Sequence, residues 1–323
     1  MEDELIQYLY TFNYDSNEVD LALLEMRAMF SKEAKDKVLI SQRLYDPSVS
    51  PFIKARLDII DQAPSLEDLV DRVRNRGLED HEFLVDYLTY PGDQRSTRDQ
   101  KAACKAIGMV LVNYPNFKDP KVVFGLCQVQ KTWYFGYLTP CKKDWFLHKD
   151  KPRSYSSAIN NRIAKVLVNL GTGGDRTKTL IDPCCGVGTV LIEGLYSGYK
   201  IVGRDINFKV VNDSLDNLKH FNYKTQVTVG DIKGVKDHYH ACIIDLPYNI
   251  LSPFDREAQK EIIYHGGRIS DRLVLVSSED IFDLLDELKL RVLDQASIGK
   301  IGKTSFKRRI WICEQEGGKH AAD

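Results

Sequence analysis

The pattern of apolar and polar positions differs between the first and second halves of the chain. Up to about residue 150, short β-rich runs alternate with stretches in which apolar residues recur every three or four positions. These patterns predict strands over 6–14, 37–41, 81–88, 121–129 and 133–138, and helices capped by the Asp15–Asn17 cluster and by Thr97. Residues 1–150 are therefore expected to form a small α+β region.

Beyond a polar, basic stretch at 141–157 the pattern becomes regular. A helix is expected over Ala158–Leu170. Short apolar strands then alternate with helical segments, at Thr179–Ile181, Ile201–Gly203, Gln226–Val229, Ala241–Ile244 and Leu273–Val276, and two consecutive runs follow at Leu290–Ser297 and Phe306–Cys313. Such alternation is typical of a parallel sheet with helices on both faces. We therefore expect residues 151–323 to form a Rossmann-like α/β domain with a seven-stranded, mostly parallel sheet and an antiparallel last strand.

The turn after the first of these strands is a candidate for ligand chemistry. Asp182 ends the strand, Cys184 follows, and Gly186 and Gly188 precede a helix. Glycines at this place let a ligand approach the backbone closely, and the N–H groups of the next helix face that ligand. A carboxylate repels a pyrophosphate and attracts an ammonium group, and Leu191 stands where a dinucleotide fingerprint has its third glycine. The turn therefore favours S-adenosylmethionine over NAD.

Acidic residues also end the next two strands. Asp205 stands 23 residues after Asp182, a distance at which an acid can accept hydrogen bonds from ribose hydroxyls, and Asp231 can accept one from an adenine amine. Ile206 and Ile232, next to these acids, are counted with them as cofactor-binding positions. One aspartate at a strand end is common in turns, whereas three of them together with a Gly-x-Gly turn favour cofactor binding.

The fourth strand ends in Asp245-Leu246-Pro247-Tyr248, which we interpret as the catalytic loop. An amine that attacks a sulfonium methyl must be held by acceptors so that its lone pair points at the methyl carbon. The Asp245 carboxylate and the Leu246 carbonyl can each accept an amine N–H, and Pro247 keeps Leu246 extended. Tyr248 offers a ring on which a flipped base can stack. Asp245 is also counted among the cofactor-binding positions.

Taken together, these segments resemble the catalytic domain of THUMP-containing tRNA guanosine N2-methyltransferases, the group that includes the tRNA guanosine-10 enzymes. The likeness rests on Arg153–Ala158 leading into Ala164–Leu170, the Asp182-Pro-Cys-Cys-Gly-Val-Gly-Thr turn, Gly203-Arg-Asp205, Gly230-Asp231 and Asp245-Leu-Pro-Tyr248. It implies a class I methyltransferase fold for residues 151–323, S-adenosyl-L-methionine as cofactor, and methyl transfer to the exocyclic N2 of a guanosine in tRNA. For residues 1–150 it implies a ferredoxin-like lobe and a THUMP-like RNA-binding domain.

Two positions depart from the Asp/Asn-Pro-Pro-Tyr loop of that family. Leu246 replaces the first proline, and Asn249 replaces a glycine. Leu246 keeps the carbonyl acceptor but adds an N–H, so the departure bears on the substrate and not on the reaction class. The alternatives are an amino methyltransferase that acts on rRNA, DNA or protein, and a non-catalytic RNA-binding protein with a methyltransferase fold.

The cysteine positions argue against a metal site. Seven cysteines are scattered without a C-x-x-C pair, and the adjacent Cys184 and Cys185 on a tight turn are poorly placed to chelate one ion. The odd number and the lack of such a pair also argue against a disulfide framework, so we expect a reducing compartment. The chain has no apolar run of membrane-spanning length, and its acidic start lacks the apolar core of a signal peptide. We expect a cytoplasmic protein with no metal and no membrane contact, and leave open whether it is a monomer or a homodimer.

Charge is segregated along the chain although its sum is −1, from 45 basic and 46 acidic residues. Residues 131–165 carry eight basic side chains against two acidic ones, and residues 297–309 carry five against none. RNA phosphates are expected at these two stretches. Trp133, Trp145 and Phe146 are candidates for stacking on bases, and Arg204 is expected to point to solvent. The charge pattern supports tRNA as the partner.

Overall fold

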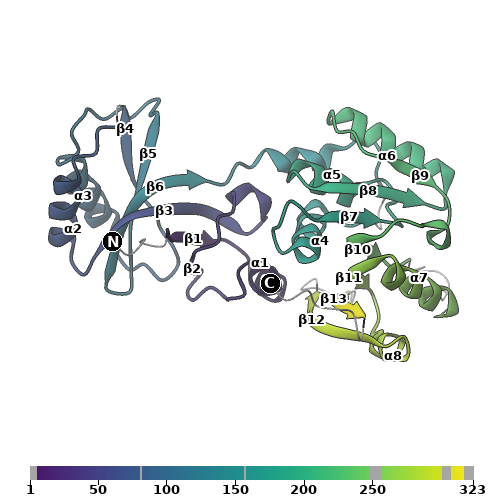
Figure 1. Ribbon diagram of the computed structural model, residues 1–323. Coiled ribbons are helices and arrows are strands. Elements are labelled where there is room, and N and C mark those ends of the chain that lie inside the picture. Colours follow the sequence, from purple (N-terminus) through teal and green to yellow (C-terminus); the bar gives the residue numbers. More distant parts are fainter. Residues whose placement is uncertain (1–5, 81, 156–157, 248–255, 300–306, 316–323) are drawn as a thin grey trace. The chain divides into compact units, whose positions relative to one another are not determined.

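The computed structural model describes residues 6–80, 82–155, 158–247, 256–299 and 307–315 (Figure 1). Contacts between residues divide the chain into two units. Unit 1 comprises Met1–Asn13, Lys32–Ser48 and Phe52–Lys142, and unit 2 comprises Tyr14–Ser31, Val49–Pro51 and Lys143–Asp323. Neither unit is continuous in sequence. The division at residue 150 into two domains with separate functions remains a prediction.

Unit 1 is built on one six-stranded sheet in the order β2-β1-β3-β6-β5-β4. Its strands are β1 (Tyr8–Phe12), β2 (Val38–Ser41), β3 (Ile53–Ala63), β4 (Phe83–Tyr87), β5 (Val122–Val129) and β6 (Thr132–Pro140). β4 and β5 are parallel neighbours, and the other neighbouring strands named here are antiparallel. The helices α2 (Leu66–Arg76) and α3 (Thr97–Gly108) pack on the sheet, over an apolar core that includes Leu69, Phe83, Phe124 and Phe135.

The sequence analysis missed β3 and α2. β3 lies between β1 and β6, so it joins the strands of the first forty residues and those of 83–140 into one sheet. Charged residues interrupt its apolar pattern, because Arg56 and Asp58 both lie within the strand and pair with each other, with 2.5 Å between Nε and Oδ1. The two charges neutralise each other within the strand. In the sequence, however, two charged residues so close together are more typical of a loop than of a strand.

The N-terminal caps of two predicted helices differ from those expected. The Asp15–Asn17 cluster does not cap α1 (Val19–Phe30), which begins after Glu18 without a side-chain cap. Ser96, and not Thr97, caps α3 by accepting the Asp99 N–H at 3.2 Å. The elements themselves form where the apolar spacing predicts them.

Unit 2 has a seven-stranded sheet in the order β12-β13-β11-β10-β7-β8-β9. The strands are β7 (Thr179–Asp182), β8 (Lys200–Asp205), β9 (Val227–Val229), β10 (Tyr239–Asp245), β11 (Ser270–Ser277), β12 (Leu290–Gly299) and β13 (Lys307–Gln315). From β9 to β11 the neighbours are parallel, whereas β13 is antiparallel to both β11 and β12. This confirms the predicted sheet, and it is the strand order of a Rossmann-like methyltransferase fold.

Helices cover the sheet of unit 2. The helices α4 (Asn161–Thr172), α5 (Thr189–Tyr196) and α6 (Phe208–His220) pack on β8–β11, and α7 (Arg256–Arg268) and α8 (Phe282–Glu287) pack with β10–β12. The α7 and α8 side holds a core that includes Ile181, Ile244, Ile263, Leu284 and Trp311. The short 3-10 helix η3 (Ile232–Gly234) contacts α7.

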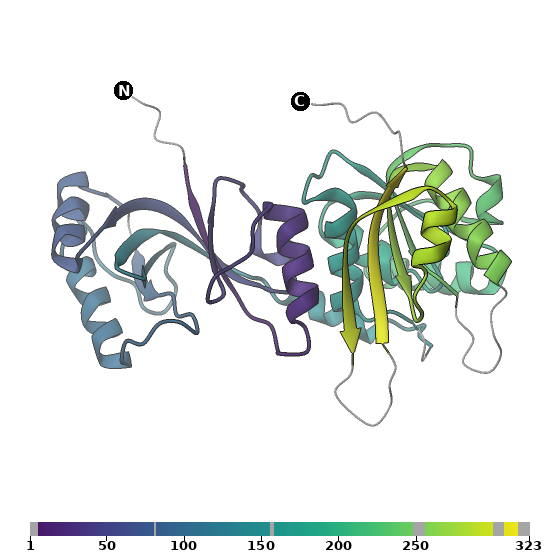
Figure 2. The same ribbon diagram turned by 90° about the horizontal axis from the view of Figure 1, so that it is seen from below.

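The helix α1 belongs to unit 2, where it packs on α4 and β12 (Figure 2). Its Arg27 makes a bidentate pair with Asp294 of β12, at 2.6 and 2.9 Å. Glu25 is buried and accepts hydrogen bonds from Ser50 Oγ at 2.5 Å and from Asn169 Nδ2 at 2.7 Å. Burial raises the pKa of Glu25 to about 7. An early helix of the chain is thus fixed to α4 by polar contacts as well as by packing.

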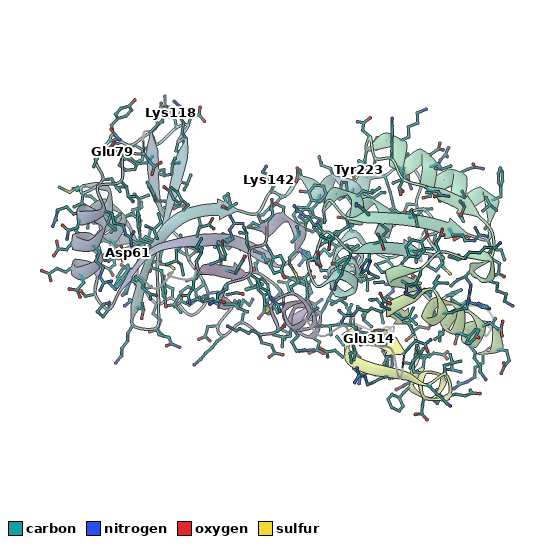
Figure 3. All side chains as sticks on the ribbon, in the orientation of Figure 1. Asp61, Glu79, Lys118, Lys142, Tyr223 and Glu314 are labelled. Carbon is teal, nitrogen blue, oxygen red and sulfur yellow. The ribbon has the colours of Figure 1, made fainter. Side chains whose placement is uncertain are left out.

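A buried polar cluster joins α4 and α5 to the 3-10 helix η2 (Asp144–Asp150). Lys165 and Glu193 are both fully buried, with 3.5 Å between Nζ and Oε2. His148 Nδ1 lies 2.8 Å from the other Glu193 oxygen, and its Nε2 lies 3.3 Å from the hydroxyl of Tyr223, which Figure 3 labels. Lys165 is therefore not part of a surface patch, which corrects the charge count predicted for residues 131–165.

Candidate active site

The turn between β7 and α5 needs glycine at two positions. Gly186 and Gly188 have φ of 51° and 80°, in the left-handed region that favours glycine. A Cβ on Gly186 would lie 2.5 Å from the Tyr155 hydroxyl, and one on Gly188 would collide with the Ser214 hydroxyl. Asp182 ends β7 just before this turn. Its burial and the tight backbone together form a cradle at the carboxyl edge of the sheet.

The acids at the ends of the next two strands are held in place by backbone N–H groups. Asp205 accepts from Gly186 N and from Asn207 N, both at 2.9 Å. Asp231 caps η3 by accepting from Lys233 N at 2.9 Å. Because these carboxylates are oriented by the main chain, their remaining lone pairs are available to a ligand.

Arg204 does not point to solvent, contrary to the prediction. Its Nε donates to the Asp231 carbonyl at 2.9 Å, and its Nη1 donates to Thr228 Oγ1 at 3.0 Å. A Cβ on Gly230 would collide with this guanidinium. Arg204 therefore binds the loop that carries Asp231, and the glycine before that aspartate makes room for it.

Two further carboxylates, Asp182 and Asp245, lie in the interior of the site. Burial raises the pKa of Asp182 well above its usual range, and the negative charges of Asp205 and Asp245 raise it further, while the N–H of Cys184 lowers it in part. Burial also raises the pKa of Asp245, to about 7, although the Arg308 guanidinium lowers it. A ligand that carries positive charge or N–H donors would stabilise both carboxylates and lower the pKa of each.

One oxygen of Asp245 is buried and unused. Its Oδ1 has no hydrogen-bond partner within the described part of the chain. The next residue is held to the neighbouring strand, because Leu246 N donates to the Val276 carbonyl at 2.9 Å. A buried acceptor without a partner costs free energy, so this oxygen indicates where a donor from a ligand belongs.

A cavity of about 570 Å³ connects these residues. It is lined by Tyr155, Pro183, Cys184, Asp205, Ile206, Gly230, Asp231, Ile232, Asp245, Leu246, Pro247 and Ile262. None of these described lining residues is basic, so the wall suits hydroxyl, amine and ammonium donors and repels phosphate. Its volume lies in the range of small-molecule sites. Burial raises the pKa of the Cys184 thiol, which makes it a neutral part of the wall.

The predicted site residues fall into three groups. Eight of them line the cavity, namely Cys184, Asp205, Ile206, Asp231, Ile232, Asp245, Leu246 and Pro247. Asp182, Gly186 and Gly188 form the turn beside it. Tyr248 and the neighbouring Asn249 lie outside the described residues. The assignment of these residues to cofactor and substrate remains a prediction.

Sequence reasoning missed Tyr155 as a member of the site, and it missed the effect of the Arg308 charge on Asp245. Tyr155 lines the cavity, and its pKa is raised to about 12 by burial and by the charges of Asp245, Asp205 and Asp182. The Arg153–Ala158 segment had been singled out for its resemblance, but no spacing rule connects it to Gly186. Arg308 had been counted only as a basic surface residue.

Within the described residues, no group of three or more His, Cys, Asp or Glu side chains is arranged to hold a metal ion. No helix in that same part of the chain combines the length and the apolar character needed to cross a membrane.

Comparison with known proteins agrees with the fold. Residues 149–265 match the model of a protein family described as RMKL-like, methyltransferase domain. Together with the strand order, this match identifies the fold of unit 2 as a methyltransferase fold, with the cavity at the carboxyl edge of its sheet.

Relatives with curated names match over part of the chain. A tRNA (guanine(10)-N2)-dimethyltransferase of Methanothermobacter thermautotrophicus is 32% identical over 120 residues, which cover 36% of this chain and 34% of that protein. The protein of the same name from Pyrococcus abyssi is 30% identical over 145 residues, which cover 42% of this chain and 43% of that one. The chain thus spans less than half the length of either relative. TrmN from Thermus thermophilus, a solved structure, is 13% identical, covers 96% of this chain and 99% of that one, and has a TM-score of 0.46.

Proposed function

We propose that the protein is an S-adenosylmethionine-dependent RNA methyltransferase that methylates the exocyclic N2 amine of a guanosine in tRNA. The observation that carries the proposal is the unpartnered, buried oxygen of Asp245 in a cavity whose other acids stand at the ends of neighbouring strands. The names of the two relatives support the base and the RNA. As a tRNA-modifying enzyme, the protein is expected to work in the cytoplasm.

The donors and acceptors of the cavity fit S-adenosylmethionine. Asp182, beside the Gly186–Gly188 turn, would hold the α-ammonium group, Asp205 the ribose hydroxyls and Asp231 the adenine amine. The apolar side chains of Ile206 and Ile232 would flank the adenine, and Cys184 would form part of the wall. When bound, the cofactor supplies an activated methyl group on a sulfonium, so the protein has no need to generate a strong nucleophile.

The chain's own contribution to the reaction is positioning. Asp245 Oδ1 would accept one N–H of the target amine, and the Leu246 carbonyl would accept the other, which turns the lone pair of the nitrogen to the methyl group. Pro247 stiffens the loop, and Tyr248 would stack on the base. The buried oxygen of Asp245 is shielded from water, which strengthens its hydrogen bond to the amine. The amine loses its proton as or after the methyl arrives, and Asp245 is the adjacent acceptor for it.

Residues 1–150 would bind the tRNA, as a ferredoxin-like lobe and a THUMP-like domain. Unit 1 offers a cavity of about 650 Å³ beside α3, where Lys101 and Lys105 adjoin apolar residues. Met109 and Phe117 of this cavity are 75% and 78% exposed. Apolar surface beside lysines suits bases and their phosphates. Of the three aromatic residues predicted to stack on bases, Phe146 is exposed, whereas Trp133 and Trp145 are buried.

The decisive experiment identifies the methylated nucleoside. The full chain is incubated with S-adenosylmethionine labelled in its methyl group and with tRNA from cells that lack the gene, and the tRNA is digested to nucleosides. Label in N2-methylguanosine or N2,N2-dimethylguanosine, absent with an Asp245→Asn protein, is expected. Label in another nucleoside would refute the base assignment. Parallel incubations offer rRNA, DNA and protein in place of tRNA, and label in one of these but not in tRNA would favour the other amino methyltransferases. Cofactor-free RNA binding without any transfer would favour the non-catalytic alternative.

Cofactor binding is expected to release a proton. Burial raises the pKa of Asp182 well above its usual range, so the free protein holds a proton there over a wider pH range than an exposed aspartate does. The ammonium group of the cofactor favours the carboxylate, so binding expels that proton. Affinity should therefore rise as the pH rises through the pKa of Asp182 in the free protein. Calorimetry in two buffers of different ionisation enthalpy measures the released proton.

An Asp182→Asn protein is the control for this titration. It keeps the shape of the side chain but has no proton to release at residue 182, so its binding enthalpy should depend less on the buffer than that of the unaltered protein. Buffer-independent binding by the unaltered protein would contradict the role given to Asp182.

A further inference from the structure

The last strand brings an arginine to the candidate catalytic aspartate. Across three neighbouring strands, Asp245 of β10 pairs with Val276 of β11, and Val276 pairs with Ile310 of β13. Paired residues share a face of the sheet, and so do residues two apart on one strand. Arg308, two positions before Ile310, therefore lies on the same face as Asp245.

Arg308 also lies at the edge of the sheet where the acids gather. β13 is antiparallel to β11, and the register ends where Ser277 pairs with Arg309. Because that register ends at Arg309, Arg308 lies just beyond the carboxyl end of β11. The long side chain can pass the end of β11 towards β10. Arg308 Nε is buried, which agrees with a side chain directed inward.

The groups around Asp245 are acidic or neutral, and Arg308 adds a positive charge to them. Asp245 faces the carboxyl of Asp182, the thiol of Cys184 and the hydroxyl of Tyr155, and its charge raises the pKa of each of these groups. These neighbours offer no positive charge. The Arg308 guanidinium acts in the opposite direction and lowers the pKa of Asp245.

We propose that Arg308 is a positioning residue that keeps the Asp245 carboxylate ionised and turned towards the target amine. The inference rests on the proposed function and deepens it, because it assigns a cation of the terminal strand to the acceptor that holds the amine. It also differs from the role predicted from charge, in which Arg308 contacts RNA phosphates. The adjacent Arg309 does not share the role, since its Nη1 donates to Asp280.

This difference gives a matched pair of variants, Arg308→Met and Arg309→Met. The rate of methyl transfer is measured in single turnovers against pH, with saturating cofactor and RNA. Because a nearby positive charge lowers the pKa of a carboxyl, the loss of Arg308 is expected to move the acid limb of the profile up by about one pH unit. The rate then falls about tenfold on the acid side and recovers at high pH. Arg309→Met should leave the limb in place.

Two further results distinguish the proposal from its rivals. Arg308→Lys keeps the positive charge, so it should shift the limb by less than half as much as Arg308→Met. A contact with RNA phosphate predicts instead a raised KM for RNA at every pH, with the limb unmoved, and that result would overturn the proposal.

A measurement that does not depend on methyl transfer separates this proposal from the proposed function. In protein labelled with 13C at the aspartate carboxyls, the Asp245 signal is assigned by its loss in Asp245→Asn, and its titration is followed in the free protein. The midpoint is expected to rise in Arg308→Met and to stay unchanged in Arg309→Met. An equal midpoint in all proteins refutes the role of Arg308. If the unaltered protein transfers no methyl group, the proposed function fails while this titration still decides the effect of Arg308.

Discussion

A Lys165→Met protein is expected to be about 3–5 kcal/mol less stable than the unaltered chain. Lys165 is fully buried, with its Nζ 3.5 Å from Glu193 Oε2, 3.2 Å from Ser197 Oγ and 4.2 Å from the centre of the Tyr196 ring. Methionine fills a similar volume but leaves the fully buried Glu193 without its cation. Thermal unfolding of the full chain should show a fall in Tm of about 10 °C.

Two controls separate the buried charge from loss of packing. Lys165→Met combined with Glu193→Gln removes both charges, and most of the lost stability should return. Lys233 and Glu261 form an ion pair of 2.9 Å in which both side chains are about half exposed, so Lys233→Met should leave Tm nearly unchanged. An equal fall in Tm for Lys165→Met and Lys233→Met would show that burial does not strengthen the first pair.

An Asp245→Asn protein is expected to transfer methyl groups about 10²–10³-fold more slowly, with little change in cofactor affinity. The amide has the shape of the carboxylate but no charge, and its NH2 group donates where the target amine also donates. In one orientation of the amide, its NH2 group takes the place of the unpartnered Oδ1 of Asp245 and faces the N–H donors of the amine. In the other orientation, an uncharged oxygen stands there and accepts a weaker hydrogen bond. Single-turnover rates at saturating cofactor measure the loss.

Asp205→Asn is the matched variant at the neighbouring strand end. Asp205 lines the same cavity, but its proposed partner is the ribose, so its loss should weaken cofactor binding more than it slows transfer. Equilibrium dialysis with labelled cofactor distinguishes the two variants. If Asp245→Asn weakens cofactor binding as much as it slows transfer, the carboxylate holds the cofactor and not the amine.

The strand-end acids could be placed from sequence because the geometry of a parallel sheet is simple. Every βα unit brings the carboxyl end of its strand to the same edge, so Asp182, Asp205, Asp231 and Asp245 come together once the strands are recognised. The strong apolar runs of unit 2 made those strands recognisable. Gly186 and Gly188 could also be predicted from sequence, because a tight turn between a strand and a helix commonly needs glycine.

Contacts between side chains from distant parts of the sequence could not be predicted from the order of the strands. Arg204 turns back to the carbonyl of Asp231, Tyr155 reaches Gly186 from the segment before α4, and Arg308 comes from the far end of the chain. No local period encodes such approaches. The strand β3 was missed for a related reason, since its charges are satisfied by one another inside the strand.

The packing of α1 has a consequence for the order in which the molecule can be completed. A ribosome makes Val19–Phe30 early, but α4 and β12, on which this helix packs, come much later. The nascent helix must therefore wait, with Glu25 lacking its partner Asn169, until the second half of the chain has emerged. A gene cut between Lys142 and Lys143 would divide these partners between two products. A fragment that starts at Lys143 would expose the surface of α4 that α1 covers, so we expect it to need residues 14–31, supplied separately or fused, to fold.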